Sequence, residues 1–181
     1  MSFPKPYADA VAKLRVFSGF LLAVAFLWLS QPSPISLAAG IPVSIAGLAI
    51  RAWAAGHLEK NLALTGSGPY AFVRNPLYIG TLAVAAGLAI ASRRWVLGAL
   101  FAIAFILIYL PVVELEEQHL RHLFPAFEAY AQRVPALWPA LSAANSGSHF
   151  RWALYVRNRE YQALLGWLAG VALLAAKVLV L

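Results

Sequence analysis

Residues 95–113 read WVLGALFAIAFILIYLPVV, a run of 19 residues without a charged side chain. A helix needs roughly 17 to 25 predominantly apolar residues to cross the hydrocarbon core of a bilayer. This stretch therefore predicts a membrane-spanning helix, and it sets the expected class of the whole chain.

Four further apolar stretches accompany this run, and together they predict an all-α, polytopic membrane protein. The chain of 181 residues is 62% hydrophobic and 12% charged, which is about half the charged fraction of a typical soluble domain. We expect about five spans within a single domain that covers residues 1–181. The predicted spans are residues 14–29, 36–55, 76–91, 95–113 and 161–181.

The first stretch, residues 14–29, has a second interpretation. It is short for a bilayer helix and begins beside the basic residues Lys13 and Arg15, as the apolar region of a signal peptide does. Small residues near Ala38 and Ala39 would then mark the cleavage site. The membrane span is favoured, because the apolar run is long for a signal peptide.

The net charge of +7 indicates contact with membrane lipids, and no nucleic-acid partner is expected. The basic residues collect in short loops between apolar stretches, as in the cytoplasmic loops of membrane proteins. Five spans with a cytoplasmic N-terminus would place most of these loops on the cytoplasmic side, together with the parts of residues 62–139 that lie outside the predicted spans. Arg93 and Arg94 conflict with that topology, unless residues 76–113 form a shallow hairpin that does not fully cross.

The composition also limits the chemistry. The chain has no cysteine, which excludes disulfides, thiolate metal sites and a cysteine nucleophile. His119 and His122 lie close to three acids, but the Glu-x-x-His spacing of di-metal bundles must occur on two helices, and one segment carries it here. We therefore expect no metal.

Residues 68–80 read GPYAFVRNPLYIG and carry the first motif. The Gly-Pro and Asn-Pro pairs predict two turns, the second of which starts a helix with Asn75 as the N-cap and Pro76 in the first position. A helix start attracts anionic groups, and Tyr70 and Tyr78 would add aromatic faces. An ordinary capped helix with interfacial tyrosines is the alternative.

Two further motifs follow. Residues 114–124 read ELEEQHLRHLF. Acids are unfavourable at a helix C-terminus, so either the preceding helix continues past them or they serve function rather than stability. Residues 127–139 read FEAYAQRVPALWP and predict a short amphipathic helix that ends before Val134-Pro135.

Taken in order, these motifs resemble the isoprenylcysteine carboxyl methyltransferase and phospholipid methyltransferase superfamily. The resemblance covers roughly Leu62 to Pro139. It implies an integral membrane enzyme that transfers a methyl group from S-adenosylmethionine to a lipophilic substrate in the bilayer. The matching positions are Arg74-Asn75-Pro76-Leu77-Tyr78-Ile79-Gly80, Glu116-Glu117 with Leu120 and Phe124, and Tyr130 with Arg133-Val134-Pro135.

By position, the resemblance also implies a cofactor site. Backbone groups would read the adenine edge, and the helix start would take the cofactor carboxylate. An acid would pair with its ammonium group, and aromatic faces would attract the sulfonium. The implied cofactor-binding residues are Leu62, Ala63, Leu64, Thr65, Tyr70, Arg74, Asn75, Pro76, Leu77, Tyr78 and Glu116.

Two residues are candidates for the transfer step itself. Arg133 has a fixed charge and a forked donor group, which suits the placing of an acidic acceptor. Glu117, or His119 in its place, would accept the proton that an amine acceptor must lose. Arg157 and Arg159 either hold an anionic headgroup or belong to the ordinary basic loops of a membrane protein.

The chain departs from the eukaryotic isoprenylcysteine enzymes at three positions. Asn75 replaces the motif histidine and cannot titrate near neutrality. Val112 replaces the arginine that meets the prenylcysteine carboxylate, and Pro125 replaces a glycine. The cofactor site is still expected, whereas the acceptor stays open between a lipid-linked carboxylate and an aminophospholipid nitrogen. From other classes, a non-catalytic lipid-binding membrane protein and an NADPH-dependent reductase of related fold are the alternatives, although no glycine-rich dinucleotide fingerprint is present.

Overall fold

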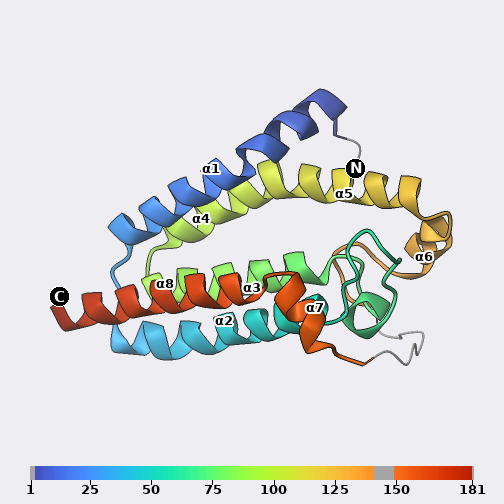
Figure 1. The fold of residues 1–181 in the computed structure, drawn as a ribbon. Coiled ribbons are helices and arrows are strands. Elements are labelled where there is room, and N and C mark those ends of the chain that lie inside the picture. Colours follow the sequence, from blue (N-terminus) through green and yellow to red (C-terminus); the bar gives the residue numbers. More distant parts are fainter. Residues whose placement is uncertain (1–2, 141–148, 181) are drawn as a thin grey trace. The chain divides into compact units, whose positions relative to one another are not determined.

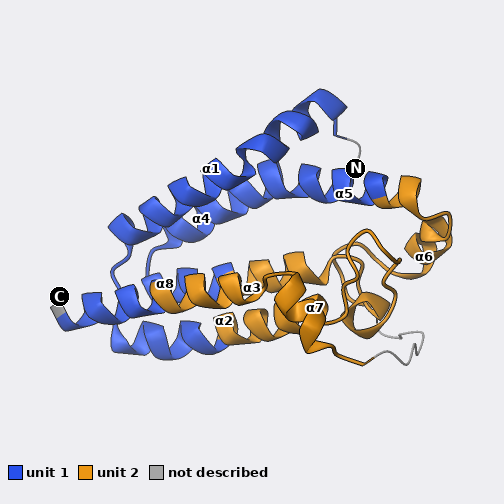
Figure 2. Cartoon of the chain, viewed as in Figure 1, with its two compact units in different colours: residues 1–42, 85–119, 170–181 blue, residues 43–84, 120–169 orange. Residues whose placement is uncertain are grey.

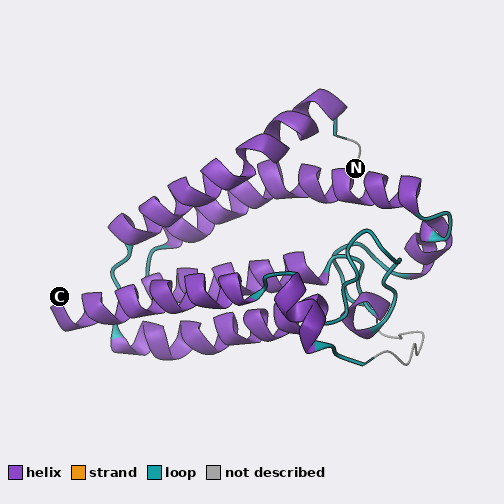
Figure 3. Cartoon of the chain, in the orientation of Figure 1, coloured by secondary structure: helices purple, strands orange, loops and turns teal. Residues whose placement is uncertain are grey.

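The computed structural model describes residues 3–140 and 149–180, and within them the chain is helical without strands (Figure 1, Figure 3). The predicted all-α class is confirmed. The elements are α1 (Lys5–Leu29), α2 (Pro34–Ala55), the 3-10 helix η1 (Gly68–Ala71), α3 (Pro76–Ser92), α4 (Trp95–Ala104), the π-helix η2 (Phe105–Tyr109), α5 (Leu110–Leu123), α6 (Phe127–Arg133), α7 (Trp152–Arg157) and α8 (Tyr161–Val180).

Within the described residues, four helices are long and apolar enough to cross a membrane: α1, α2, the continuous helix Trp95–Leu123 and α8. The chain is therefore a helical membrane protein. The remaining apolar helix, α3, has 17 residues, which corresponds to roughly 25 Å along its axis. A hydrocarbon core is about 30 Å thick, so α3 crosses it only if the bilayer thins or its polar flanks extend the span.

Two helices are longer than the apolar stretches that predicted them. Helix α1 begins at Lys5 rather than near residue 14, because Pro6 suits the first turn of a helix and Ala8 and Val11 are buried. The helix that contains residues 95–113 continues to Leu123. The acids at residues 114–117 therefore lie inside a helix, and the unfavourable C-terminal position does not arise.

The chain forms two compact units (Figure 2). Unit 1 comprises Met1–Pro42, Ala85–His119 and Gly170–Leu181, and unit 2 comprises Val43–Val84 and Leu120–Ala169. The chain passes from one unit to the other within α2, α3, α5 and α8.

In unit 1, two cations cap the C-terminus of α1. Arg94 Nε donates to the carbonyl of Leu29 at 3.0 Å, and Lys177 Nζ donates to the carbonyls of Leu27 and Ser30 at 2.6 and 3.0 Å. Cations are favourable at this end of a helix, where the last carbonyls lack partners. The contact with Leu29 thus gives Arg94 a structural role at this position, although the residue conflicts with the topology expected from the basic loops.

In unit 2, α2 and α3 cross so closely that their backbones meet. A Cβ atom on Gly47 would lie 2.6 Å from the carbonyl oxygen of Gly80 and from the amide nitrogen of Val84. Glycine permits this approach, as it does in other membrane helix pairs. Trp167 Nε1 of α8 also contacts α2, where it donates to Ser44 Oγ at 2.8 Å.

The segment before α8 caps the C-terminus of α2 in unit 2. The amide of Arg151 donates to the carbonyl of Gly56 at 2.9 Å. Asn158 Nδ2 donates to the carbonyls of Ala55 and Leu58, each at 2.9 Å. These contacts fix the beginning of the polar loop after α2 to the segment that precedes α8.

Candidate functional site

The first and third sequence motifs form a backbone clasp in unit 2. The amides of Arg74 and Asn75 donate to the carbonyls of Pro135 and Ala136, at 2.8 and 3.2 Å. In the other direction, the amide of Ala140 donates to the carbonyl of Phe72 at 2.8 Å. Two irregular segments that are about sixty residues apart in the sequence are therefore joined by backbone hydrogen bonds directly before α3.

Side chains reinforce this clasp. Arg74 Nη1 donates to the carbonyls of Ala131 and Val134, at 2.8 and 2.9 Å, and so caps the C-terminus of α6. The hydroxyl of Tyr130 donates to the carbonyl of Tyr70 at 2.7 Å in a buried position. Helix α6 ends at Arg133, as predicted. Phe127, Tyr130 and Val134 form a buried apolar core, and the partly buried residues Leu64, Leu120, Phe124 and Ala131 pack against it.

Helix α3 begins at Pro76, as the Asn-Pro pair predicts. The carbonyl of Asn75 accepts hydrogen bonds from the amides of Tyr78 and Ile79, at 3.1 and 3.3 Å. Asn75 Nδ2 donates to the carbonyl of Ala136 at 3.2 Å. The positive end of the α3 dipole therefore lies at the clasp.

An apolar cavity of about 250 Å³ adjoins the clasp. It is a shallow surface hollow, since Trp53 and Phe72 in its lining are themselves exposed, and it is bounded by α2, by η1 and the residues after it, by the first turn of α3 and by Pro139. Its lining consists of apolar and aromatic residues: Ile50, Trp53, Pro69, Phe72, Val73, Pro76, Ile79 and Pro139.

The predicted cofactor segment Leu62–Thr65 forms a turn before η1. The amides of Leu62 and Ala63 donate to the carbonyl of Glu59, and the amide of Glu59 donates to Thr65 Oγ1 at 3.3 Å. Leu62 is exposed, whereas Leu64 packs on the α6 core. Unit 2 thus contains all predicted cofactor residues except Glu116.

The other predicted residues have different surroundings. Arg133 is exposed and donates through Nε to the carbonyl of Ala129 in its own helix, at 3.2 Å. Glu116 and Glu117 belong to unit 1. There Glu116 lies 3.6 Å from Arg15 in an ion pair whose side chains are about half exposed.

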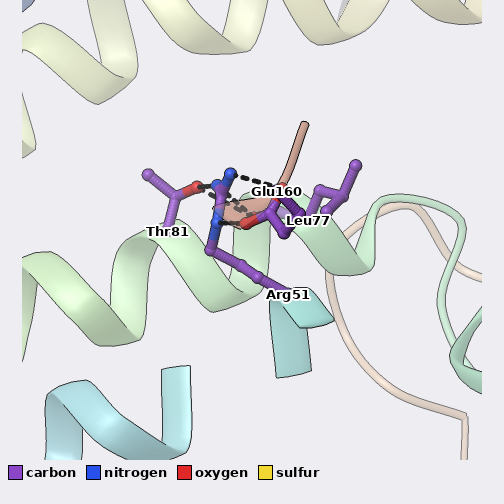
Figure 4. Close-up of polar contacts among 4 residues, drawn as sticks. All are labelled: Arg51, Leu77, Thr81 and Glu160. Carbon is purple, nitrogen blue, oxygen red and sulfur yellow. Dashed lines mark hydrogen bonds and ion pairs between the residues drawn. The ribbon is translucent and has the colours of Figure 1, made fainter. Parts of the chain in front are cut away.

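A polar cluster that the sequence did not predict joins α2, α3 and the start of α8 (Figure 4). Arg51 Nε and Nη2 donate to the two carboxylate oxygens of Glu160, at 2.6 and 3.1 Å. Arg51 Nη1 donates to Thr81 Oγ1 and to the carbonyl of Leu77, the latter at 3.4 Å. The Glu160 side chain is 9% exposed and that of Arg51 22%.

His57 is a second residue that the sequence did not single out. Its ring occupies the place of a Cβ on Gly68, whose φ of +57° also favours glycine. Nδ1 lies 2.9 Å from the carbonyl of Trp53, and because a carbonyl only accepts, this nitrogen carries the proton. His57 thereby holds the η1 turn against α2 beside the cavity.

Comparison with protein families matches residues 35–126, about half of the chain, to the phospholipid methyltransferase family. The chain belongs to this family. The match confirms the superfamily resemblance and identifies the chain as a membrane protein of a methyltransferase family. As a phospholipid methyltransferase family member, the chain carries its first two motifs inside the matched residues and the Tyr130–Pro139 motif beyond them.

Two curated relatives are similar to this phospholipid methyltransferase family member. The cobalt-zinc-cadmium resistance protein CzcN of Cupriavidus metallidurans is 37% identical over 129 residues, which cover 70% of this chain and 58% of the relative. The nickel-cobalt-cadmium resistance protein NccN of Alcaligenes xylosoxydans xylosoxydans is 36% identical over 102 residues, which cover 55% of this chain and 48% of the relative. The chain thus spans about half the length of these relatives. No solved structure matches the chain.

Proposed function

We propose that this protein transfers a methyl group from S-adenosylmethionine to a lipophilic acceptor in the membrane. The observation that carries the proposal is the clasp between residues 72–75 and 135–140, which joins two methyltransferase motifs beside an apolar cavity. The family match supports methyl transfer in general.

The residues at the clasp fit the parts of such a cofactor. The α3 dipole favours a carboxylate at the start of the helix, next to Asn75 and Tyr78. The aromatic rings of Tyr70 and Tyr78 belong to the same segment and suit a sulfonium or an adenine ring. Glu116, which belongs to unit 1 and not to the clasp, is proposed as the partner of the cofactor's ammonium group from its place in the second sequence motif alone.

The transfer requires little covalent chemistry from the protein. S-adenosylmethionine supplies a methyl carbon whose bond to sulfur breaks as a bond to the acceptor oxygen or nitrogen forms, and the sulfur keeps the electron pair. The protein has to align the acceptor and exclude water. The apolar cavity lining suits the hydrocarbon part of such an acceptor.

The acceptor decides which side chains act. For a carboxylate acceptor, Arg133 would place the ionised group. For an aminophospholipid, Glu117 would take the proton that the nitrogen must lose before attack. Since Val112 stands where the isoprenylcysteine enzymes have an arginine, the aminophospholipid is the second form of the proposal.

Calorimetric titration of the detergent-purified protein with S-adenosylhomocysteine tests the cofactor site. We expect micromolar binding, and we expect Tyr78→Ala and Glu116→Ala each to weaken it at least tenfold. Tyr155→Ala and Glu128→Ala are matched controls outside the proposed site and should leave the affinity unchanged.

Absence of binding to the folded wild-type protein would overturn the proposal. The same titration with NADPH would then separate a reductase, which should bind it, from a non-catalytic lipid-binding protein, which should bind neither nucleotide.

A further inference from the structure

All three nitrogens of the Arg51 guanidinium group donate hydrogen bonds. Two of its nitrogens meet the two oxygens of Glu160, and the third meets Leu77 and Thr81 on α3 (Figure 4). Because the guanidinium is planar, the bidentate pair with Glu160 fixes the direction in which Nη1 points. Arg51 is thus a rigid link and not an open binding site for an anion.

The contacts of Arg51 reach the first turns of α3. The carbonyl of Leu77 accepts from Arg51 Nη1 and also from Thr81 Oγ1, at 2.8 Å. Gly80 lies directly under the Arg51 side chain, since a Cβ there would be 2.5 Å from Arg51 Cγ. Rotation of α3 about its axis would break these contacts.

The same helical turns form part of the apolar cavity. On α3, Pro76 and Ile79 line the cavity, while Leu77 and Thr81 face Arg51. On α2, the residues on either side of Arg51 in this turn, Ile50 and Trp53, line it as well. Arg51 therefore links the two helices, α2 and α3, whose residues form two walls of the cavity.

Stability alone does not require an ion pair in this place. Two desolvated charges recover little net free energy, and an apolar pair of similar volume often packs as stably. What an apolar pair lacks is the directed contact with the carbonyl of Leu77. Ionisable residues among membrane helices commonly have such functional tasks.

We propose that Arg51 and Glu160 are a positioning pair for the methyl-transfer site. The pair sets the rotation of the start of α3 against α2, and with it the cavity wall of Pro76 and Ile79. Neither Arg51 nor Glu160 lines the cavity. The expected effect on catalysis rests on the proposed function. The expected effect on the position of α3 does not depend on it.

The test compares the wild type with the double variant Arg51→Met/Glu160→Leu and with the matched control Arg121→Met/Glu128→Leu, whose ion pair is exposed. Four quantities are measured: the melting temperature, the hydrogen exchange of peptides that cover residues 75–81, and the kcat and KM with S-adenosylmethionine. We expect the Arg51 double variant to melt within a few degrees of the wild type. Its exchange should be at least tenfold faster, with kcat/KM at least tenfold lower. The control double variant should leave both the exchange of residues 75–81 and kcat/KM unchanged.

Arg51→Lys separates charge from direction. Lysine keeps the ion pair with Glu160, but its single ammonium group cannot also reach the carbonyl of Leu77 as the forked guanidinium does. The exchange of residues 75–81 should therefore still be faster than in the wild type. If the Arg51 double variant does not fold, Thr81→Val removes one contact of Nη1 and the bond from Thr81 Oγ1 to the carbonyl of Leu77, and it leaves the ion pair intact. We then expect about threefold faster exchange.

Unchanged exchange and unchanged kcat/KM in the folded double variant would overturn the positioning proposal. Unchanged exchange in Thr81→Val would do the same where the double variant does not fold. A wild-type protein that binds no S-adenosylhomocysteine contradicts the proposed function instead, and the exchange measurement still decides whether the pair fixes α3.

Discussion

Glu160→Ala is expected to lower the free energy of unfolding by about 3 kcal/mol, because it leaves the Arg51 charge among helices without its carboxylate partner. The lower end of the range for broken buried pairs applies, since the Arg51 side chain is 22% exposed. Unfolding of the purified protein in mixed detergent micelles, followed by circular dichroism, measures the change.

The control for this prediction is Glu128→Ala. Glu128 lies 2.9 Å from Arg121, but the two side chains are 59% and 49% exposed. Water replaces a lost partner at such a site, so we expect a change of about 0.2 to 1 kcal/mol. Equal effects of the two substitutions would show that the Arg51–Glu160 pair is not desolvated and would contradict this description of unit 2.

Gly47→Val should disrupt the crossing of α2 and α3. The new side chain would meet the backbone of Gly80 and Val84 at 2.6 Å, and a backbone cannot move aside as a flexible side chain does. Overpacking of a filled site costs typically 1 to 3 kcal/mol, and we expect about 3 kcal/mol or more here because both contacts are backbone atoms. The melting temperature in detergent reports the loss.

Gly166→Val in α8 is the matched control, because the substitution is identical and, beyond its chain neighbours and the backbone of its own helix, no described atom lies within 4 Å of the added Cβ. It should leave the melting temperature nearly unchanged. If both valine variants melt like the wild type, the close contact of α2 and α3 is absent from the protein in detergent.

The helical class and most helix positions could be predicted because they depend on local sequence. A charge-free run predicts a span, and the Asn75-Pro76 pair predicts the start of α3. The start of α1 could not, because residues 5–13 are too polar for a hydropathy signal although they form a helix. Hydropathy detects the part of a helix that suits lipid, and not its ends.

The predicted site could be derived in part. Motif order indicated that residues 74–80 and 130–139 act together, and the structure joins them through backbone hydrogen bonds. Arg74 was predicted to hold the cofactor, yet Nη1 caps α6, a contact that no single-sequence pattern reveals. The Arg51–Glu160 pair was missed because its members are 109 positions apart and meet only through the packing of α2 and α8.

Methyl transfer by the protein can be measured in membranes. Membranes containing the protein are incubated with S-adenosylmethionine labelled in its methyl group, and the label is followed into the organic extract. We expect label to enter a lipid-soluble product with the wild type, and the amount to fall at least tenfold with Tyr78→Ala. Alkaline hydrolysis of the product then separates a methyl ester from an N-methylated headgroup. Label that stays in the aqueous phase, with wild-type protein shown to be folded, would contradict methyl transfer to a lipophilic acceptor.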